Sequence, residues 1–166
     1  MSERNGTVVC PGTYDPVTLG HVDIITRTAN VFDKVVVGVV NNPLRKDKTL
    51  FSAEERKEFI KGATADLGNV EVQIFSTLLV EFARQNDAHA IVKGMRAISD
   101  FEYEFEMAQL NRKLDPGIES IYVIASPHYS FLSSTGVKEM ATFGGDVGDL
   151  VPPAVARALA ERLDNR

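Results

Sequence analysis

Short apolar runs alternate along this chain with longer segments whose apolar residues recur at helical spacing. The pattern predicts strands at residues 7–10, 34–40, 70–75, 90–92 and 120–125. Helices are predicted at residues 18–32, 52–66, 78–85, 99–114, 133–143 and 153–163. Strands and helices that alternate in this way indicate an α/β fold with a parallel sheet. The run 34–40 is apolar at nearly every position, so helices must cover both faces of that sheet.

The order of the elements also predicts where a site lies. Ligands of open α/β sheets bind at the carboxyl ends of the strands, near the point where the strand order reverses. The segments that should converge there are residues 11–21, 41–48, 75–79, 93–100 and 126–135. They contain Arg45, Lys46, Lys48, Lys93 and Arg96. Because the whole chain has a formal charge of −5, this local excess of cations predicts a pocket for small phosphorylated molecules.

Length and composition narrow the class of protein. The 166 residues fit one domain, residues 1–166, that ends in the helix at about 153–163. No basic arm or stripe is present, so no nucleic-acid partner is expected. No apolar stretch approaches the roughly 18 residues that span a membrane, and the polar first residues are not typical of a signal peptide. Cys10, the single cysteine, has no partner for a disulfide within the chain, which fits the reducing cytoplasm.

The stretch CPGTYDPVTLGH, residues 10–21, joins the first strand to the first helix. Gly20 at the start of a helix lets a ligand or another backbone come close. The N-terminus of a helix favours an anion, and His21 adds a directed hydrogen-bond donor there. A lone histidine in this position is more often a surface or capping residue, so the four residues Thr18–His21 do not decide the function by themselves.

The whole stretch resembles the signature of the nucleotidyltransferase superfamily that carries a (T/H)-x-G-H motif. Further stretches, in order along the chain, are similar to the bacterial phosphopantetheine adenylyltransferase family: FSAEER, GNVEV, KGMRAISDFEYEFEMAQLNRKL and YSFLSSTGVKEMA. The resemblance implies a single-domain Rossmann-like fold of the nucleotidyltransferase type, with a five-stranded parallel sheet. It implies transfer of the adenylyl group of ATP to 4′-phosphopantetheine, which yields dephospho-coenzyme A and pyrophosphate. Mg²⁺ held by the ATP phosphates, a cytoplasmic homohexamer and coenzyme A as a feedback ligand are further expectations from it.

The resemblance also implies roles for individual residues. The expected catalytic residues are His21, as transition-state stabiliser, Lys93 and Arg96. The expected ATP-binding residues are Thr13, Tyr14, His21, Gly94, Met95, Arg96, Glu104, Tyr129, Ser130, Phe131, Leu132, Ser133, Ser134 and Thr135. The expected phosphopantetheine-binding residues are Thr13, Arg45, Leu79 and Lys93. No protein side chain is expected to bind a metal ion.

The loop after the second strand departs from the family pattern. Relatives usually read Asn/Ser-Pro-x-Lys there, whereas this chain has Arg45 at the matching distance from Pro43. The favoured interpretation gives Arg45 the role of that lysine. The alternative is that the longer loop brings Lys46 inward instead.

Several other residues have plainer interpretations. Asp15 and Pro16 are typical of a turn, and Lys138 is expected to be a cation on a helix surface. Cys10 is expected to be a small buried hydrophobe, because no base is evident beside it. His89 and His128 lack the spacing of metal ligands and are expected to be structural or exposed.

The helix at 99–114 carries two apolar stripes. One stripe is Phe101, Phe105 and Ala108, and the other is Tyr103, Met107, Leu110 and Leu114. Two stripes predict a helix that is buried on two sides, either by the sheet and a neighbouring element or by another subunit.

Two rival functions remain open at this point. The chain could be another small-molecule nucleotidyltransferase of the same superfamily, or a non-catalytic module that binds adenine nucleotides. The intact Thr18-Leu-Gly-His21 motif argues against the module. Pyrophosphate release separates the module from an enzyme, and a comparison of acceptors separates the two enzymes.

Overall fold

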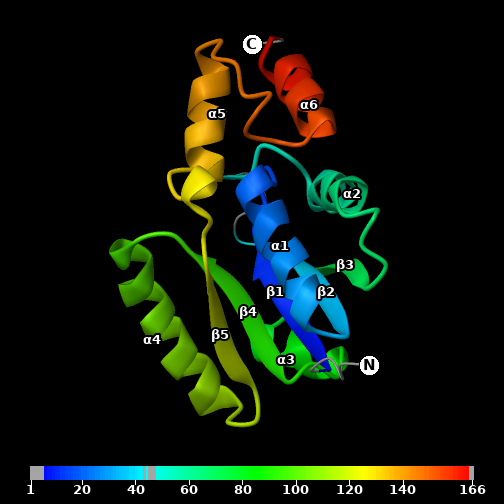
Figure 1. The fold of residues 1–166 in the computed structure, drawn as a ribbon, viewed down its shortest axis with the longest axis vertical. Coiled ribbons are helices and arrows are strands. Elements are labelled where there is room, and N and C mark those ends of the chain that lie inside the picture. Colours follow the sequence, from blue (N-terminus) through cyan, green and yellow to red (C-terminus); the bar gives the residue numbers. More distant parts are fainter. Residues whose placement is uncertain (1–5, 43, 45–47, 165–166) are drawn as a thin grey trace.

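Five parallel strands form one sheet in the order β3-β2-β1-β4-β5 (Figure 1). The structure is a computed structural model, and it describes residues 6–42, 44 and 48–164. The strands are β1 (Thr7–Gly12), β2 (Lys34–Val40), β3 (Val70–Phe75), β4 (Ala90–Met95) and β5 (Glu119–Ile124). The helices are α1 (Leu19–Val31), α2 (Ala53–Ala63), α3 (Leu79–Gln85), α4 (Ile98–Leu114), α5 (Ser134–Thr142) and α6 (Pro153–Asp164). The predicted five-stranded α/β fold is confirmed.

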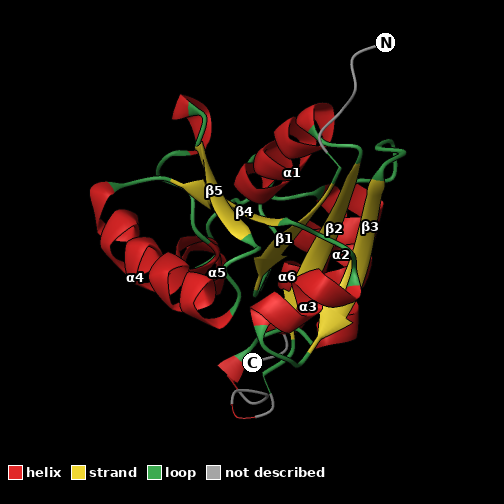
Figure 2. Ribbon diagram, turned by 90° about the horizontal axis from the view of Figure 1, so that it is seen from below, coloured by secondary structure: helices red, strands yellow, loops and turns green. Residues whose placement is uncertain are grey.

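Helices cover both faces of the sheet, as the apolar central strands require (Figure 2). Alternate residues of β1 enter two different cores. Val8 packs in the core that contains Ile25 of α1, whereas Val9 packs in the core that contains Val80 of α3. Successive side chains of a strand point to opposite faces, so a continuous apolar run becomes the shared wall of two cores.

The strand order places a topological switch point beside β1. The chain runs from β1 outward to β2 and β3, and it then returns to β4 on the other side of β1. The loops that follow β1 and β4 therefore leave the sheet toward opposite sides. A crevice opens at the carboxyl ends of these strands, where open α/β sheets bind their ligands.

One strand extends further than predicted. Residues 93–95 continue β4 and pair with β5, in the register Lys93 with Tyr122 and Met95 with Ile124. The prediction of a loop directly after residue 92 was wrong, because charged and small residues can continue a strand where the end of the sheet borders a cavity instead of a core. The predicted ends of the other elements lie within three residues of the observed ones.

Helix α4 differs more from the prediction. It lies beside β5 at one edge of the molecule (Figure 1). Only Asn111 is buried among its residues, while Phe101, Tyr103 and Phe105 are each at least half exposed. The alternative in which this chain alone buries both stripes was wrong, because the sheet and α3 do not cover them.

Candidate active site

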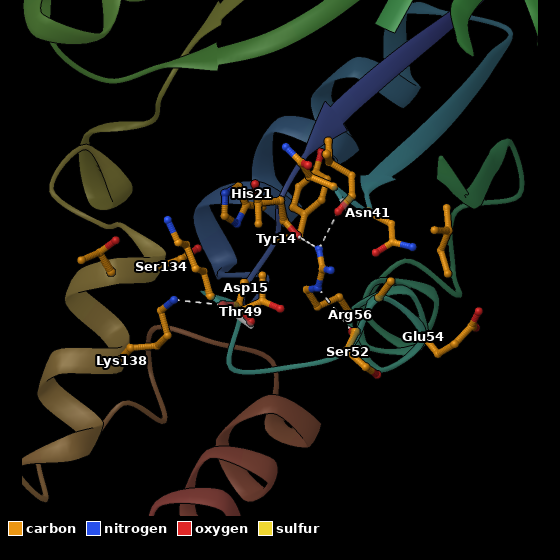
Figure 3. A pocket seen from close by; sticks show the side chains of 17 residues that line it. Tyr14, Asp15, His21, Asn41, Thr49, Ser52, Glu54, Arg56, Ser134 and Lys138 are labelled. Atoms are coloured by element: carbon orange, nitrogen blue, oxygen red, sulfur yellow. Dashed lines mark hydrogen bonds and ion pairs between the residues drawn. The ribbon is translucent and has the colours of Figure 1, made fainter. Parts of the chain in front are cut away.

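Two cavities lie at the carboxyl ends of the strands, and they share a wall. The larger has a volume of about 780 Å³ and borders β1, β2, the start of α2 and α5 (Figure 3). The smaller has a volume of about 410 Å³ and borders β1, β4, α4 and the segment before α5. Both cavities are lined by Tyr14, His21, Ser134 and Thr135. The site therefore has room for two ligands that meet at these four residues.

His21 is held by the motif that precedes it. Thr18 is the N-cap of α1, and the backbone N–H of Thr18 donates to Nδ1 of His21 at 3.0 Å. In return, the backbone N–H of His21 donates to the Thr18 hydroxyl at 3.3 Å. This is a capping box in which histidine occupies the third helical position. Because Nδ1 accepts a hydrogen bond, the neutral imidazole carries its proton on Nε2.

The surroundings of His21 keep the imidazole neutral. Burial and the positive charge of Arg96 lower its pKa from 6.5 to about 4. A second proton would go to Nδ1, where it would face the N–H of Thr18. His21 therefore offers an uncharged Nε2–H donor near neutral pH.

Tyr14 supports His21 from the core side. Its φ is 52°, its hydroxyl donates to the carbonyl of Cys10 at 3.0 Å, and its ring meets the His21 ring edge-on at 5.0 Å. Gly12 makes room for that ring, because a Cβ there would lie 2.9 Å from it. Burial raises the pKa of Tyr14 well above its usual value. The Tyr14 hydroxyl donor is thus committed to the core.

An ion pair joins two elements across the larger cavity. Asp15 is 3% exposed and accepts hydrogen bonds from the N–H groups of Leu50 and Phe51, at 2.8 and 2.9 Å. Lys138 of α5 reaches the same carboxylate at 3.0 Å (Figure 3). The prediction that Lys138 is a surface cation was wrong, since its ammonium group lines the cavity. Asp15 is more than a turn residue, because it ties the turn after β1 to α5 and to the approach to α2.

Arg56 of α2 is a buried residue that sequence reasoning missed. It is 3% exposed, yet it lines the larger cavity (Figure 3). Its Nη1 donates to the carbonyls of Thr13 and Val40 at 2.7 and 3.0 Å, and its Nε donates to those of Phe51 and Ser52 at 3.1 and 3.3 Å. The sequence signal was the capping box at residues 52–55, which predicts a helix start but says nothing of the next side chain.

Opposite charges pair within the smaller cavity. Lys93 of β4 lies 3.1 Å from Glu104 of α4, and both side chains are largely buried. Arg96 donates to the carbonyl of Leu132 at 2.7 Å and contacts Asp100 at 3.5 Å. The loop after β4 is thereby joined to the segment before α5, and it closes one side of the cavity.

The first turn of α5 forms the far wall. Ser133 is its N-cap and accepts from the N–H of Gly136 at 3.0 Å, while the hydroxyl of Ser134 donates to the carbonyl of Pro16 at 2.8 Å. The hydroxyl of Ser134 is thus occupied. The start of the helix, with its N–H groups and the positive end of its dipole, remains the feature that suits a phosphate.

Most of the expected site residues meet around the two cavities. The smaller cavity is lined by Tyr14, His21, Lys93, Gly94, Arg96, Glu104, Tyr129, Leu132, Ser133, Ser134 and Thr135. Thr13 and Lys48 line the larger one. Met95, Ser130, Phe131 and Leu79 line neither of these two cavities. Arg45 and Lys46 lie outside the described residues, so the choice between them stays a prediction.

Some residues outside this set behave as expected. Cys10 is a buried free thiol, which confirms its interpretation as a small hydrophobe. His89 and His128 are exposed.

Within residues 6–42, 44 and 48–164 there is no group of three His, Cys, Asp or Glu residues that could hold a metal ion. No helix in the same part of the chain is long and apolar enough to cross a membrane.

Comparison with known proteins identifies the family. The profile of the family described as cytidylyltransferase-like matches residues 9–140. A phosphopantetheine adenylyltransferase of Streptomyces coelicolor is 53% identical over 158 residues, which cover 95% of this chain and 98% of that protein. Another, from Caldanaerobacter subterraneus subsp. tengcongensis, is 52% identical over 93% of this chain and 96% of that protein. This chain belongs to the phosphopantetheine adenylyltransferase family.

The family resemblance found in the motifs is thereby confirmed, and the chain is a nucleotidyltransferase. A solved structure from Vibrio parahaemolyticus, provisionally named a nicotinate-nucleotide adenylyltransferase, superposes with a TM-score of 0.61. The match covers 96% of this chain and 92% of that one at 18% sequence identity. At that identity the likeness extends to the fold and not to the acceptor. The shared sheet and its switch point are thus common to phosphopantetheine adenylyltransferases and more distant proteins.

Proposed function

We propose that this enzyme transfers the adenylyl group of ATP to 4′-phosphopantetheine and releases pyrophosphate. The observation that carries the proposal is the pair of cavities that meet at His21. A reaction between two phosphorylated molecules needs both to reach one point, and here the shared wall carries the histidine of the family motif. The smaller cavity suits ATP, since most residues expected to bind it lie there. The larger cavity suits the acceptor.

His21 acts on the α-phosphate of ATP. Its Nε2–H is an uncharged donor whose direction is fixed by the contact between Thr18 and Nδ1. A donor aimed at the position where negative charge develops stabilises the transition state more than the bound substrate. Burial and Arg96 lower the pKa of His21 to about 4, so the free enzyme near pH 7 presents a neutral hydrogen-bond donor.

The attacking group is the phosphate of phosphopantetheine. With a second pKa near 6, that phosphate is mostly a dianion at pH 7, so no general base is required. Lys48 lines the larger cavity, and Lys93 lies in the smaller one on the other side of the shared wall; both support binding of this phosphate where the two ligands meet. Catalysis then depends on placing the attacking oxygen in line with the bond to the leaving pyrophosphate.

The leaving group is stabilised at the start of α5. The first turn of that helix, Ser133 to Thr135, and Arg96 line the cavity proposed for ATP. Mg²⁺ bound to ATP phosphate oxygens would neutralise part of the charge that develops on pyrophosphate. The nearby carboxylates fit this assignment, because Glu104 pairs with Lys93 and Asp100 contacts Arg96, which leaves the metal to phosphate oxygens.

We also propose that the enzyme is a cytoplasmic homohexamer. The half-exposed apolar residues of α4 support assembly, because isolated subunits rarely leave so many large apolar side chains on one helix uncovered. The free thiol of Cys10 fits a reducing compartment. Coenzyme A, which shares its phosphopantetheine part with the acceptor, is the proposed feedback ligand.

The experiment measures which product the enzyme forms with each acceptor. The purified enzyme with ATP, Mg²⁺ and 4′-phosphopantetheine should release pyrophosphate, and mass spectrometry should show dephospho-coenzyme A only when both substrates are present. Nicotinate mononucleotide as acceptor and CTP as donor are the matched controls. Faster turnover with nicotinate mononucleotide would show that it, and not 4′-phosphopantetheine, is the acceptor. Binding of ATP without pyrophosphate release in any mixture would contradict an enzymatic function.

A further inference from the structure

Arg56 places a positive charge inside the protein without a carboxylate beside it. Its guanidinium is almost fully buried, and no Asp or Glu among the described residues lies within 4.0 Å of it. Burial lowers its pKa, an effect that the charge of Asp15 opposes. Burying a charge is costly unless hydrogen bonds compensate for the lost water. The compensation here comes from four backbone carbonyls, so the fold uses Arg56 to fix the backbone at the bottom of the larger cavity.

The four carbonyls belong to three segments that converge at the larger cavity. Thr13 follows β1, Val40 ends β2, and Phe51 and Ser52 lead into α2. Thr13 receives the shortest of these hydrogen bonds, at 2.7 Å. The end of a central strand and the N-cap of a helix are rigid reference points, whereas Thr13 lies in a turn. Arg56 therefore fixes the position of that turn relative to β2 and α2.

The contact with Thr13 also sets the direction of the next N–H group. In a trans peptide the C=O and N–H point in opposite directions. Because the carbonyl of Thr13 points at Arg56, the N–H of Tyr14 points away from it. This N–H has no acceptor among the described residues, although Tyr14 is 7% exposed and lines both cavities. The backbone N–H of Tyr14 is thus an unpaired donor in the wall that the two cavities share, which His21 also lines.

We propose that Arg56 is a positioning residue of the adenylyl transfer. By holding the Thr13 carbonyl, it aims the N–H of Tyr14 at the phosphate that is transferred, and it keeps the Tyr14 ring against His21 at 5.0 Å. This rests on the proposed function for the identity of that phosphate. Arg56 itself acts through Tyr14 and His21, with its Nε and Nη1 donors committed to the backbone.

The geometry explains why arginine occupies this position. Nη1 and Nε lie on one planar group and reach carbonyls from three segments at once. A lysine at this position would keep the charge but would concentrate its donors at one point. Arg56→Lys therefore separates the effect of charge from the effect of geometry.

The test compares Arg56→Lys and Arg56→Met with a matched control, Arg162→Met. Arg162 also contacts the approach to α2, through the carbonyl of Leu50 and the carboxylate of Glu55, but it has no contact with Thr13 in the described structure. Steady-state kinetics and melting temperatures are measured for all three. We expect both Arg56 variants to lose roughly 10- to 100-fold in kcat, with KM for each substrate within about threefold of the parent. Arg162→Met should lose thermal stability and keep its kcat.

Three kinetic outcomes would overturn the inference. A folded Arg56→Lys enzyme with kcat within about threefold of the parent would show that charge alone suffices. A rise in KM for the acceptor at unchanged kcat would make Arg56 an anion ligand instead. An equal loss of kcat in Arg162→Met would assign the effect to α2 in general. If Arg56→Met does not fold, Arg56→Lys alone decides among these outcomes.

A spectroscopic measurement tests the same inference without turnover. Labelling with ¹⁵N-tyrosine gives four backbone signals, because the chain has four tyrosines. The Tyr14 signal should shift on addition of α,β-methylene-ATP, and the shift should shrink in Arg56→Lys but not in Arg162→Met. An unchanged shift in Arg56→Lys would refute the positioning role. If the parent enzyme shows the shift but makes no dephospho-coenzyme A, the proposed acceptor fails and the positioning role stands.

Discussion

The protonation state of His21 gives the most direct test of the proposed chemistry. We expect the imidazole to remain neutral, with its proton on Nε2, down to a pH of about 5. The perturbations are a pH titration of the intact enzyme and the variant Arg96→Met, which removes one cause of the lowered pKa. Because burial is the larger cause, the variant should raise the pKa of His21 only part of the way toward 6.5.

The size of the effect follows from the two pKa values. The difference between 6.5 and about 4 corresponds to roughly 3 kcal/mol between the protonation states. At pH 5.5 about 3% of His21 would be protonated, against about 90% of a histidine of ordinary pKa. The unfolded chain binds this proton more readily than the folded one. His21 therefore contributes stability that is fully present above pH 6.5 and is lost as the pH falls toward 4.

The assay is long-range ¹H–¹⁵N correlation NMR of the imidazole rings, since the rate itself also depends on the acceptor phosphate, which titrates near pH 6. The chain has three histidines, so the signals can be assigned by single substitutions. His89 and His128, which are both exposed, account for the other two imidazole signals. A pKa of His21 at or above 6 would refute the lowering of that pKa by burial and Arg96. A proton on Nδ1 would refute the hydrogen bond that Nδ1 accepts from the N–H of Thr18.

Three further predictions concern catalysis, the acceptor loop and assembly. His21→Ala should lower kcat by roughly 10²–10³ with a smaller effect on ATP binding, as measured by kinetics and calorimetry; a loss below about threefold would make His21 only a capping residue. Among single alanine substitutions at Arg45, Lys46 and Lys48, Arg45→Ala should raise the KM for phosphopantetheine most and leave that for ATP nearly unchanged, and a larger effect of Lys46→Ala would reverse the assignment. Light scattering should report a hexamer, and a monomer near 18 kDa at working concentration would contradict the proposed role of α4.

The sheet and the position of the site could be predicted from the sequence because they depend on local patterns. Apolar runs of strand length separated by amphipathic segments leave few topologies, and the switch point follows from the order of the strands. The capping box of Thr18 and His21 is likewise local, since its members lie three residues apart. The motif could therefore be recognised before its geometry was known.

The contacts that complete the site could not be predicted, because they join residues far apart in the chain. Lys138 lies 123 residues from Asp15, and Arg56 lies 43 residues from Thr13. A charged residue on an amphipathic helix is usually solvated, so neither cation carries a local sign of burial. The exposure of α4 could not be predicted from local patterns either, because an apolar stripe has the same sequence whether this chain or another subunit covers it.

Cys10 lies beside a site whose proposed acceptor itself ends in a free thiol. A reactive cysteine there could exchange disulfides with oxidised phosphopantetheine and remain covalently blocked, because such exchange proceeds through a thiolate. Burial raises the pKa of Cys10 to about 12, so on the order of one molecule in 10⁵ carries the thiolate at pH 7. Cys10 is thus protected from capture by the proposed acceptor. Ellman's reagent should accordingly leave the folded protein unmodified and react once the chain unfolds.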